Sequence, residues 1–450
     1  MSRFTRCVVL AILPCALFAQ ESGLLAPTPP MGWNSWDSYG MTVTEQEFKA
    51  NTEWLARNLK QYGWQYSVVD EGWYLQNPEA KAGLFHFTMG NDGRYWPAVN
   101  RFPSAANGAG FKALADYVHS LDLKFGIHII RGIPREAVER NAAIAGSRYH
   151  VAEAADKSDT CPWNADNYGV RNTPAGQAYY DSIANLYASW GVDFVKIDCI
   201  AANPYKGDEI RMFSTALRKT GRPIVLSLSP GPAPLEKSNE LRKYAQMWRI
   251  SGDVWDHWAQ WPNQDWSQGL LGQFKRAADW APLTVPGHWP DADMLPIGYL
   301  GPRPGQGKAR ATNFTRDEQR TLMTLWSIFR SPLIMGGNLT KLDKWTTSLL
   351  TNSDVIAVHQ HSKNNRAAVA GGTKVIWTAQ PDSGKAFYVA AFNLADTPQT
   401  LEYGWKEIGL GGRTYRIRDL WEGKDLGSAR KLTVSLQPHA PVLYRLQTEP

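Results

Sequence analysis

Residues 193–199, with the sequence DFVKIDC, could form a strand that carries a reactive carboxylate at its end. Lys196 and Asp198 are two positions apart, so their side chains share one face of such a strand. A cation beside a carboxylate keeps that carboxylate ionised, and a nucleophilic aspartate must be ionised. The alternative is a structural ion pair at a strand end. Recurrence of similar signals along the chain favours the chemical interpretation.

Acids, bases and tryptophans stand at the ends of several other predicted strands. They are Trp36 after 31–35, Asp70 at the end of 65–70 and Glu71 after it, His128 within 124–130, Arg249 near the end of 246–250 and Asp253 after it, and Asp293 in the seventh strand–helix unit. One such strand end carries little information, but several that converge on one face predict a pocket lined by acids, bases and indole rings.

From about residue 30 to residue 340, short apolar strands alternate with amphipathic helical stretches. This alternation predicts a parallel sheet covered by helices. The expected strands are 31–35, 65–70, 124–130, 193–198, 223–228, 246–250, 283–286 and 332–336, and the expected helices are 44–62, 111–122, 175–190, 207–219, 267–280 and 316–330. Thr44 and Glu47 fit a capping box at the start of the first of these helices.

Eight strands are the number that a (β/α)8 TIM barrel needs, and the active site of such a barrel lies at the carboxyl ends of its strands. A doubly wound open sheet is the main alternative. It is disfavoured because no glycine fingerprint follows the first strand. We therefore expect a barrel over 21–362.

The pattern changes beyond about residue 362, where short alternating runs separated by turn residues replace the helical period. These runs are 373–379, 386–393, 398–403, 413–419, 432–436 and 440–446. Such strand spacing predicts an antiparallel β-sandwich over 363–450.

Carboxylates together with aromatic side chains suit a carbohydrate substrate. Two carboxylates suffice to hydrolyse a glycosidic bond, one attacking the sugar and the other exchanging a proton with the leaving oxygen. Asp198 is the expected nucleophile, and Asp253 is the expected acid/base in a less polar setting beside Trp255 and Trp258. Arg249 would steady a sugar hydroxyl or the nucleophile side of the site. The alternative for Asp253 is a helix N-cap.

These motifs together resemble glycoside hydrolase family 27, the α-galactosidase family of clan D. The motifs that carry the resemblance are Met31-Gly32-Trp33-Asn34-Ser35-Trp36, Asp70-Glu71, Lys196-Ile197-Asp198 and Trp248-Arg249 followed by Asp253. The resemblance implies a retaining exo-glycosidase with a barrel and a C-terminal β-domain. It also implies sugar contacts from Trp36, Asp70, Glu71, Lys196, Arg249 and Asp293.

Several departures from the family pattern concern the sugar. Glu71 replaces the usual aspartate and is one methylene longer, where the hydroxyls at C4 and C6 would lie. His128 replaces the usual tyrosine, and Ser227–Pro232 replaces the motif that contacts the 2-hydroxyl. Related members cleave β-L-arabinopyranosides or release isomaltose from dextran. The leading hypothesis is an α-galactosidase. The alternatives are one of these other glycosidases, or a carbohydrate-binding protein without catalysis.

The first twenty residues, 1–20, have the pattern of a signal peptide, with Arg3 and Arg6 ahead of a short apolar run. We therefore expect a secreted or periplasmic protein without a membrane anchor after processing. Processing would leave Cys161 and Cys199. In an oxidising compartment these two cysteines form either one disulfide or two isolated buried thiols. In glycoside hydrolase family 27, the disulfide cysteine that corresponds to Cys199 commonly lies one residue further along the chain.

Other classes of partner have little support in the sequence. The formal net charge is only +6 and there is no basic run, so no nucleic-acid partner is expected. The nine histidines include no His-Glu-x-x-His motif, and no phosphate loop is present, so neither a metal nor another cofactor is expected. Trp255, Trp258 and Trp261 are either outer sugar platforms or a separate aromatic cluster.

Overall fold

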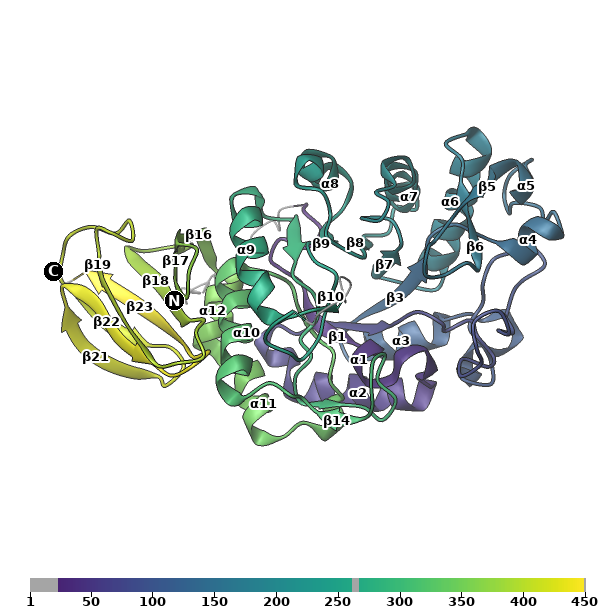
Figure 1. The fold of residues 1–450 in the computed structure, drawn as a ribbon. Coiled ribbons are helices and arrows are strands. Elements are labelled where there is room, and N and C mark those ends of the chain that lie inside the picture. Colours follow the sequence, from purple (N-terminus) through teal and green to yellow (C-terminus); the bar gives the residue numbers. More distant parts are fainter. Residues whose placement is uncertain (1–22, 261–266, 449–450) are drawn as a thin grey trace, which may run out of the picture.

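Eight parallel strands form the centre of the larger domain of this protein, in a computed structural model that describes residues 23–260 and 267–448 (Figure 1). Their order in the sheet is β12-β9-β8-β7-β3-β2-β1-β15. The strands are β1 (Met31–Asn34), β2 (Tyr66–Val69), β3 (Lys124–Ile130), β7 (Phe194–Asp198), β8 (Val225–Leu228), β9 (Met247–Arg249), β12 (Trp289–Asp291) and β15 (Leu333–Met335). A bridge from Leu295, just after β12, to Met335 of β15 connects the two edges of the sheet. The predicted TIM-barrel fold is therefore confirmed, whereas the expected signal peptide lies outside the described residues.

Helices surround this barrel. The longer ones are α2 (Glu45–Asn58), α3 (Lys112–Ser120), α6 (Pro174–Ser189), α7 (Gly207–Lys219), α8 (Ser238–Tyr244), α9 (Leu270–Trp280), α10 (Arg316–Phe329), α11 (Lys344–Leu350) and α12 (Ser353–Gln360). The short ones are α1 (Trp36–Tyr39), α4 (Arg135–Glu139) and α5 (Val151–Ala154). Helix α2 begins with the predicted capping box, in which the side chains of Thr44 and Glu47 accept each other's backbone N–H.

Small sheets and short 3₁₀ helices surround the barrel. The extra strands are β4 (Ile133–Pro134), β5 (Ala155–Thr160) and β6 (Asn167–Val170) in one sheet, β10 (Asp253–Val254) paired with β11 (Ser267–Gln268), and β13 (Tyr299–Leu300) paired with β14 (Arg310–Ala311). The 3₁₀ helices are η1 (Gly40–Thr42), η2 (Lys60–Tyr62), η3 (Pro103–Gly108), η4 (Leu235–Lys237), η5 (Ala281–Leu283) and η6 (Leu339–Lys341).

The seventh barrel strand is the one element of the barrel sheet whose prediction is wrong. The expected strand 283–286 overlaps the end of η5 and a turn in which the His288 N–H donates to the Val285 carbonyl. The strand is β12 instead, although it contains Pro290, a residue that argues against a central strand. The Trp289 N–H donates to the Gln246 carbonyl on the β9 side, so the nitrogen of Pro290 faces the opposite side, where the bridge to β15 is made by Leu295 and not by β12 itself.

The C-terminal domain is the predicted β-sandwich and lies beside the barrel (Figure 1). Its strands are β16 (Ser362–Val369), β17 (Lys374–Pro381), β18 (Ala386–Asn393), β19 (Gln399–Gly404), β20 (Tyr415–Asp419), β21 (Lys424–Ala429), β22 (Lys431–Leu436) and β23 (Pro441–Thr448). Six of them form one sheet in the order β16-β17-β18-β23-β20-β21, and β19 pairs with β22 in the other. Ile376 and Val389 from the first sheet and Leu401 and Leu432 from the second share one buried core.

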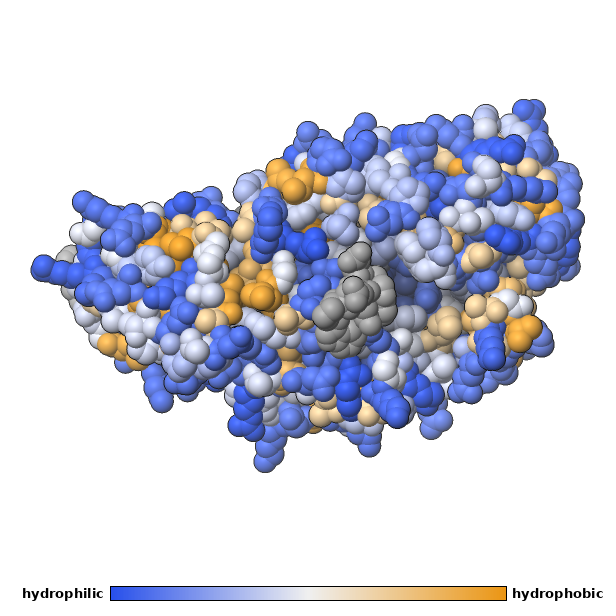
Figure 2. Space-filling model, viewed as in Figure 1, coloured by the Kyte–Doolittle hydropathy of each residue, from blue (hydrophilic) through white to orange (hydrophobic). Residues whose placement is uncertain are grey.

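The surface on the side shown in Figure 2 is mainly hydrophilic, with apolar residues in small groups. Among the described residues, no helix combines the length and the apolar character needed to cross a lipid bilayer.

Candidate active site

A cavity of about 110 Å³ lies at the carboxyl ends of the barrel strands, where a barrel of this type places its active site. It contains all nine residues that the sequence predicts for the site, namely Trp36, Asp70, Glu71, His128, Lys196, Asp198, Arg249, Asp253 and Asp293. The two proposed catalytic carboxylates therefore face the same cavity, although they come from different strands.

Asp198 ends strand β7, and only one of its carboxylate oxygens has a hydrogen-bond partner among the described residues. The indole N–H of Trp163 donates to Oδ2 over 3.2 Å, while Oδ1 is buried without a partner. The expected ion pair with Lys196 is not formed, because Lys196 Nζ lies 3.4 Å from Asp70 Oδ2 and pairs with that residue. One oxygen of Asp198 is thus anchored and the other is available to react.

Asp70, directly after β2, is the centre of a buried hydrogen-bond network. Its Oδ1 lies 2.7 Å from Nδ1 of His128, and its Oδ2 accepts from Asn34 Nδ2 over 2.7 Å and from Lys196. Burial opposes the charge of Asp70, but His128 and then Lys196 outweigh it and hold the pKa of this carboxyl well below its ordinary value. Burial likewise acts to lower the pKa of Lys196, but Asp70 raises it above its ordinary value.

Replacing Asp70 by asparagine is expected to lower the free energy of unfolding by about 3–5 kcal/mol, because a buried ionic network loses one partner. The new amide N–H groups would face donors on Lys196 and Asn34. Denaturant unfolding at pH 7 measures this loss. Since the pKa of Asp70 is lowered by folding, its stabilisation is complete above the unfolded pKa of about 3.9 and is lost as pH falls below it. The difference between the two proteins should therefore shrink at pH 3.

Asp279→Asn is the matched control for this experiment. Asp279 is an exposed carboxylate that pairs with Lys275 over 2.7 Å, and such surface pairs contribute about 0–1 kcal/mol. An equal loss of stability in the two variants at pH 7 would contradict the account of the Asp70 network.

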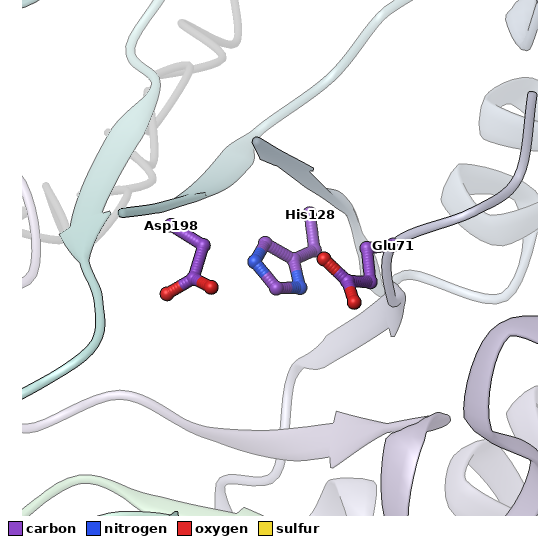
Figure 3. Close-up of side chains that lie close together, drawn as sticks. All are labelled: Glu71, His128 and Asp198. Carbon is purple, nitrogen blue, oxygen red and sulfur yellow. The ribbon is translucent and has the colours of Figure 1, made fainter. Parts of the chain in front are cut away.

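Glu71 follows Asp70 and points toward His128 and Asp198 (Figure 3). Its Oε2 is buried and has no hydrogen-bond partner among the described residues. Burial raises the pKa of Glu71 well above its ordinary value, and the charges of Asp198 and Asp70 raise it further. Glu71 therefore presents to the cavity a carboxyl oxygen that has no partner among the described residues.

Arg249, at the end of β9, pairs with two carboxylates at once. Its Nη2 lies 2.7 Å from Asp293 Oδ2 and 3.3 Å from Asp253 Oδ1. Burial raises the pKa of Asp293 to about 7, although the Arg249 guanidinium acts to lower it. The contacts of Arg249 thus lie on the Asp253 side of the site, not on the nucleophile side that was one of its two expected roles.

The surroundings of Asp253 differ from those predicted. Its side chain is 43% exposed and lies beside the Arg249 guanidinium, so the setting is more polar than expected. Asp253 begins strand β10 rather than a helix, and the N-cap alternative is therefore wrong.

The cavity also contains residues that were not predicted for the site, among them Asp37 and Trp163. Asp37 is 3% exposed in helix α1, and burial and then Asp293 raise the pKa of its carboxyl well above its ordinary value. Its Oδ2 approaches Gly336 so closely that a Cβ there would lie 1.8 Å away, which requires glycine at that position. Asp37 directly follows the predicted Trp36, and that adjacency was the available signal.

A disulfide joins Cys161 to Cys199, which resolves the two alternatives for these cysteines. Cys199 directly follows Asp198, and Trp163, the donor to Asp198, lies two residues after Cys161. The bond therefore fastens the segment that carries Trp163 to the end of strand β7. Proximity to Cys161 in the sequence was the signal that could have identified Trp163.

Replacing Cys161 by serine is expected to lower the free energy of unfolding by about 4 kcal/mol in the chain-entropy description of a cross-link between residues 38 positions apart. Denaturant unfolding of the oxidised protein and of the variant measures the difference. Addition of a reductant should destabilise only the wild type. A wild type with unchanged stability after complete reduction would contradict this prediction.

The three tryptophans that follow Asp253 in the sequence do not form one cluster at the cavity. Trp255 lines the cavity. Trp258 stacks on His439 of the sandwich domain with ring centroids 3.9 Å apart, so it joins the two domains. Trp261 lies outside the described residues.

Comparisons with known families and proteins agree with this geometry. The family described as Alpha galactosidase A matches residues 164–361, and the Alpha galactosidase C-terminal beta sandwich domain matches residues 371–446. An Alpha-galactosidase A of Cellvibrio japonicus is 27% identical over 95% of this chain and 94% of its own length.

Two solved structures have a higher sequence identity to this chain than the Cellvibrio japonicus protein has. A crystal structure of a family 27 β-L-arabinopyranosidase from Geobacillus stearothermophilus is 47% identical, covers 94% of this chain and 97% of its own, and has a TM-score of 0.89. A variant of that enzyme in complex with arabinose is 46% identical over 95% of this chain and 98% of its own, also with a TM-score of 0.89. Fold, site and sequence agree that the chain is a glycoside hydrolase and belongs to glycoside hydrolase family 27.

Proposed function

We propose that the protein is a retaining exo-glycosidase that removes terminal β-L-arabinopyranosyl residues, with α-D-galactosyl residues as the second candidate. The observation that carries this proposal is one cavity lined by both Asp198 and Asp253 together with Glu71. These residues supply a nucleophile, an acid/base and a group that contacts the sugar.

The proposed reaction proceeds in two steps. Oδ1 of Asp198 attacks the anomeric carbon, while Asp253 donates a proton to the leaving oxygen, so that a glycosyl-aspartate forms and the alcohol leaves. Asp253 then takes a proton from water, which attacks the same carbon and releases Asp198 and the free sugar. The Trp163 N–H on Oδ2 fixes the carboxylate of Asp198 so that Oδ1 is the attacking atom.

The identity of residue 71 supports arabinopyranose over galactose. β-L-Arabinopyranose has the ring configuration of α-D-galactopyranose but lacks the exocyclic hydroxymethyl group. Glu71 stands where the family typically has aspartate, and its extra methylene occupies space on the side where that group would lie. The similarity to the Geobacillus stearothermophilus β-L-arabinopyranosidase supports the same choice, whereas the α-galactosidases at 27% identity support the second candidate.

Two cavities of different size support exo-action. The catalytic cavity is small, and a second one of about 640 Å³ shares Trp36, Glu71 and Trp163 with it. The larger cavity is lined in part by aromatic residues, including Phe85 and Phe87. One terminal sugar would enter the small cavity, and the larger one leaves room for further parts of a substrate.

A panel of aryl glycosides tests the proposed function. We expect turnover of aryl β-L-arabinopyranoside with a higher kcat/KM than for aryl α-D-galactoside, and little turnover of isomaltosyl substrates. A higher kcat/KM for the α-galactoside would select the second candidate. Absence of turnover on every substrate would instead support a carbohydrate-binding protein.

Shortening Glu71 to aspartate is expected to shift the preference toward galactosides. One methylene in a substrate pocket is worth roughly 10- to 200-fold, so the ratio of kcat/KM for galactoside to that for arabinopyranoside should rise within this range. The exposed Glu79, on the same loop, provides the matched control Glu79→Asp, which should leave the ratio unchanged. An unchanged ratio in Glu71→Asp would contradict the role assigned to this side chain.

We also propose that the enzyme is exported. The predicted signal peptide and the disulfide between Cys161 and Cys199 support this proposal. N-terminal sequencing of protein recovered from cell fractions should show a chain that begins near residue 21 outside the cytoplasm. An uncleaved chain confined to the cytoplasm would contradict it.

A further inference from the structure

Three side chains at or just after the ends of neighbouring barrel strands bring potential metal-ligand atoms together in the cavity. One potential ligand atom from each of Glu71, His128 and Asp198 lies within 4.8 Å of the other two, and the imidazole lies between the carboxylates (Figure 3). Glu71 Oε2, His128 Nε2 and Asp198 Oδ1 are buried and have no hydrogen-bond partner among the described residues. Buried polar atoms normally have partners, so this group indicates a site for a ligand.

One ring nitrogen of His128 is already engaged by a carboxylate. Nδ1 lies 2.7 Å from Oδ1 of Asp70, and an ionised carboxylate can only accept, so Nδ1 carries the proton and donates it. Nε2 has no hydrogen-bond partner among the described residues, and the imidazole side chain is only 5% exposed, so Nε2 is the nitrogen left for a ligand. A histidine whose second nitrogen donates to a carboxylate is the usual arrangement for a metal ligand.

The charges around these three residues favour a cation. Glu71 and Asp198 bring two carboxylates close together, and like charges at this distance repel each other. The cationic side chains of the cavity are already paired, Lys196 with Asp70 and Arg249 with Asp293. A dication between Glu71 and Asp198 would relieve their repulsion.

We propose that Glu71, His128 and Asp198 bind a divalent transition-metal ion in the place that the sugar occupies during catalysis. One imidazole and two carboxylates form a ligand set that suits Zn²⁺. Ligands about 2.2 Å from one zinc ion lie at most about 4.4 Å apart. Small rotations of the two carboxylate side chains therefore close the site from the observed separation of within 4.8 Å.

The ion would act as an inhibitor rather than as a cofactor. It would hold the oxygen of Asp198 that attacks the sugar, and this part of the inference rests on the proposed function. Mg²⁺ and Ca²⁺ should bind poorly, because each takes six or more oxygen ligands and this site offers only two carboxylates.

Equilibrium dialysis of the full chain, free of any polyhistidine tag, against Zn²⁺ tests the site directly. We expect His128→Gln and Glu71→Gln each to weaken Zn²⁺ binding by more than the 10- to 100-fold that loss of an outer-sphere partner causes. His361→Gln is the control, because His361 is exposed beside Asp382 and should not contribute. Thermal unfolding checks that the variants are folded, and Glu71→Gln decides alone if His128→Gln does not fold. Wild-type Zn²⁺ affinity in the folded variants would overturn the proposal.

Steady-state kinetics with Zn²⁺ tests the location of the ion. We expect Zn²⁺ to raise KM for the aryl glycoside without lowering kcat, and Mg²⁺ at the same concentration to have no effect. Zn²⁺ that binds stoichiometrically but leaves KM unchanged would overturn the placement in the sugar cavity. If no glycoside is turned over, the proposed function fails, while the dialysis experiment still decides on the metal site.

Discussion

Replacement of Asp198 by asparagine is expected to lower kcat/KM by about 10⁴-fold or more, as removal of a residue at the centre of a catalytic unit does. The reason is that the amide has no charge with which to attack the anomeric carbon, although it has nearly the same shape. The Trp163 indole can still donate to the side-chain oxygen, so the fold and the affinity for sugar should change little. Initial rates on an aryl β-L-arabinopyranoside and thermal unfolding measure the two effects.

Asp208→Asn is the control for this variant. Asp208 lies in the first turn of helix α7, soon after the same strand, and its side chain is 64% exposed. Its replacement should leave kcat/KM within twofold of the wild type. If Asp198→Asn retained more than a tenth of wild-type activity, Asp198 would not be the nucleophile.

The second large effect is expected at Asp253. Replacement by alanine should lower kcat/KM by about 10²- to 10⁴-fold on substrates whose leaving group needs a proton, because general acid catalysis is lost. The first step should be nearly normal with a dinitrophenyl leaving group, which departs without protonation. Added azide should then restore turnover by attacking the glycosyl-aspartate, and the product should be a glycosyl azide of retained configuration.

The dependence on the leaving group separates an acid/base from a merely structural residue. Asp279→Ala, which removes an exposed carboxylate on α9, should show no such dependence. Equal losses on both classes of substrate in Asp253→Ala, without rescue by azide, would assign the proton transfer to another group. Asp293, which also lines the cavity, would then be the next candidate.

Much of the barrel could be predicted because a buried parallel strand needs a run of apolar residues and the following helix needs a different period. The exceptions have local causes. Strand β12 was missed because it contains Pro290, whose nitrogen faces away from β9 and so costs no ladder hydrogen bond to that strand. Strands β16 and β21 were missed because they are the two edges of the sandwich sheet and carry mostly polar side chains.

Most residues of the candidate site could be predicted because parallel barrel strands deliver their ends to one place. Asp293 is an exception, because it follows β12, which was expected at 283–286. The partners of the site residues could not be predicted. Lys196 pairs with Asp70 across strands rather than with Asp198 on its own strand, and this choice depends on distances between strands. Trp163 and Asp37 reach the cavity from a loop and from a one-turn helix, where no strand period indicates direction.

In the proposed mechanism, Asp198 attacks the sugar and carries it as a covalent ester. The most direct measurement is incubation with an activated fluorosugar of the arabino or galacto configuration, followed by proteolysis and mass spectrometry of the peptides. We predict time-dependent inactivation with one sugar per chain, attached to Asp198. Attachment to another residue, or turnover of the fluorosugar with inverted configuration and no adduct, would contradict the account.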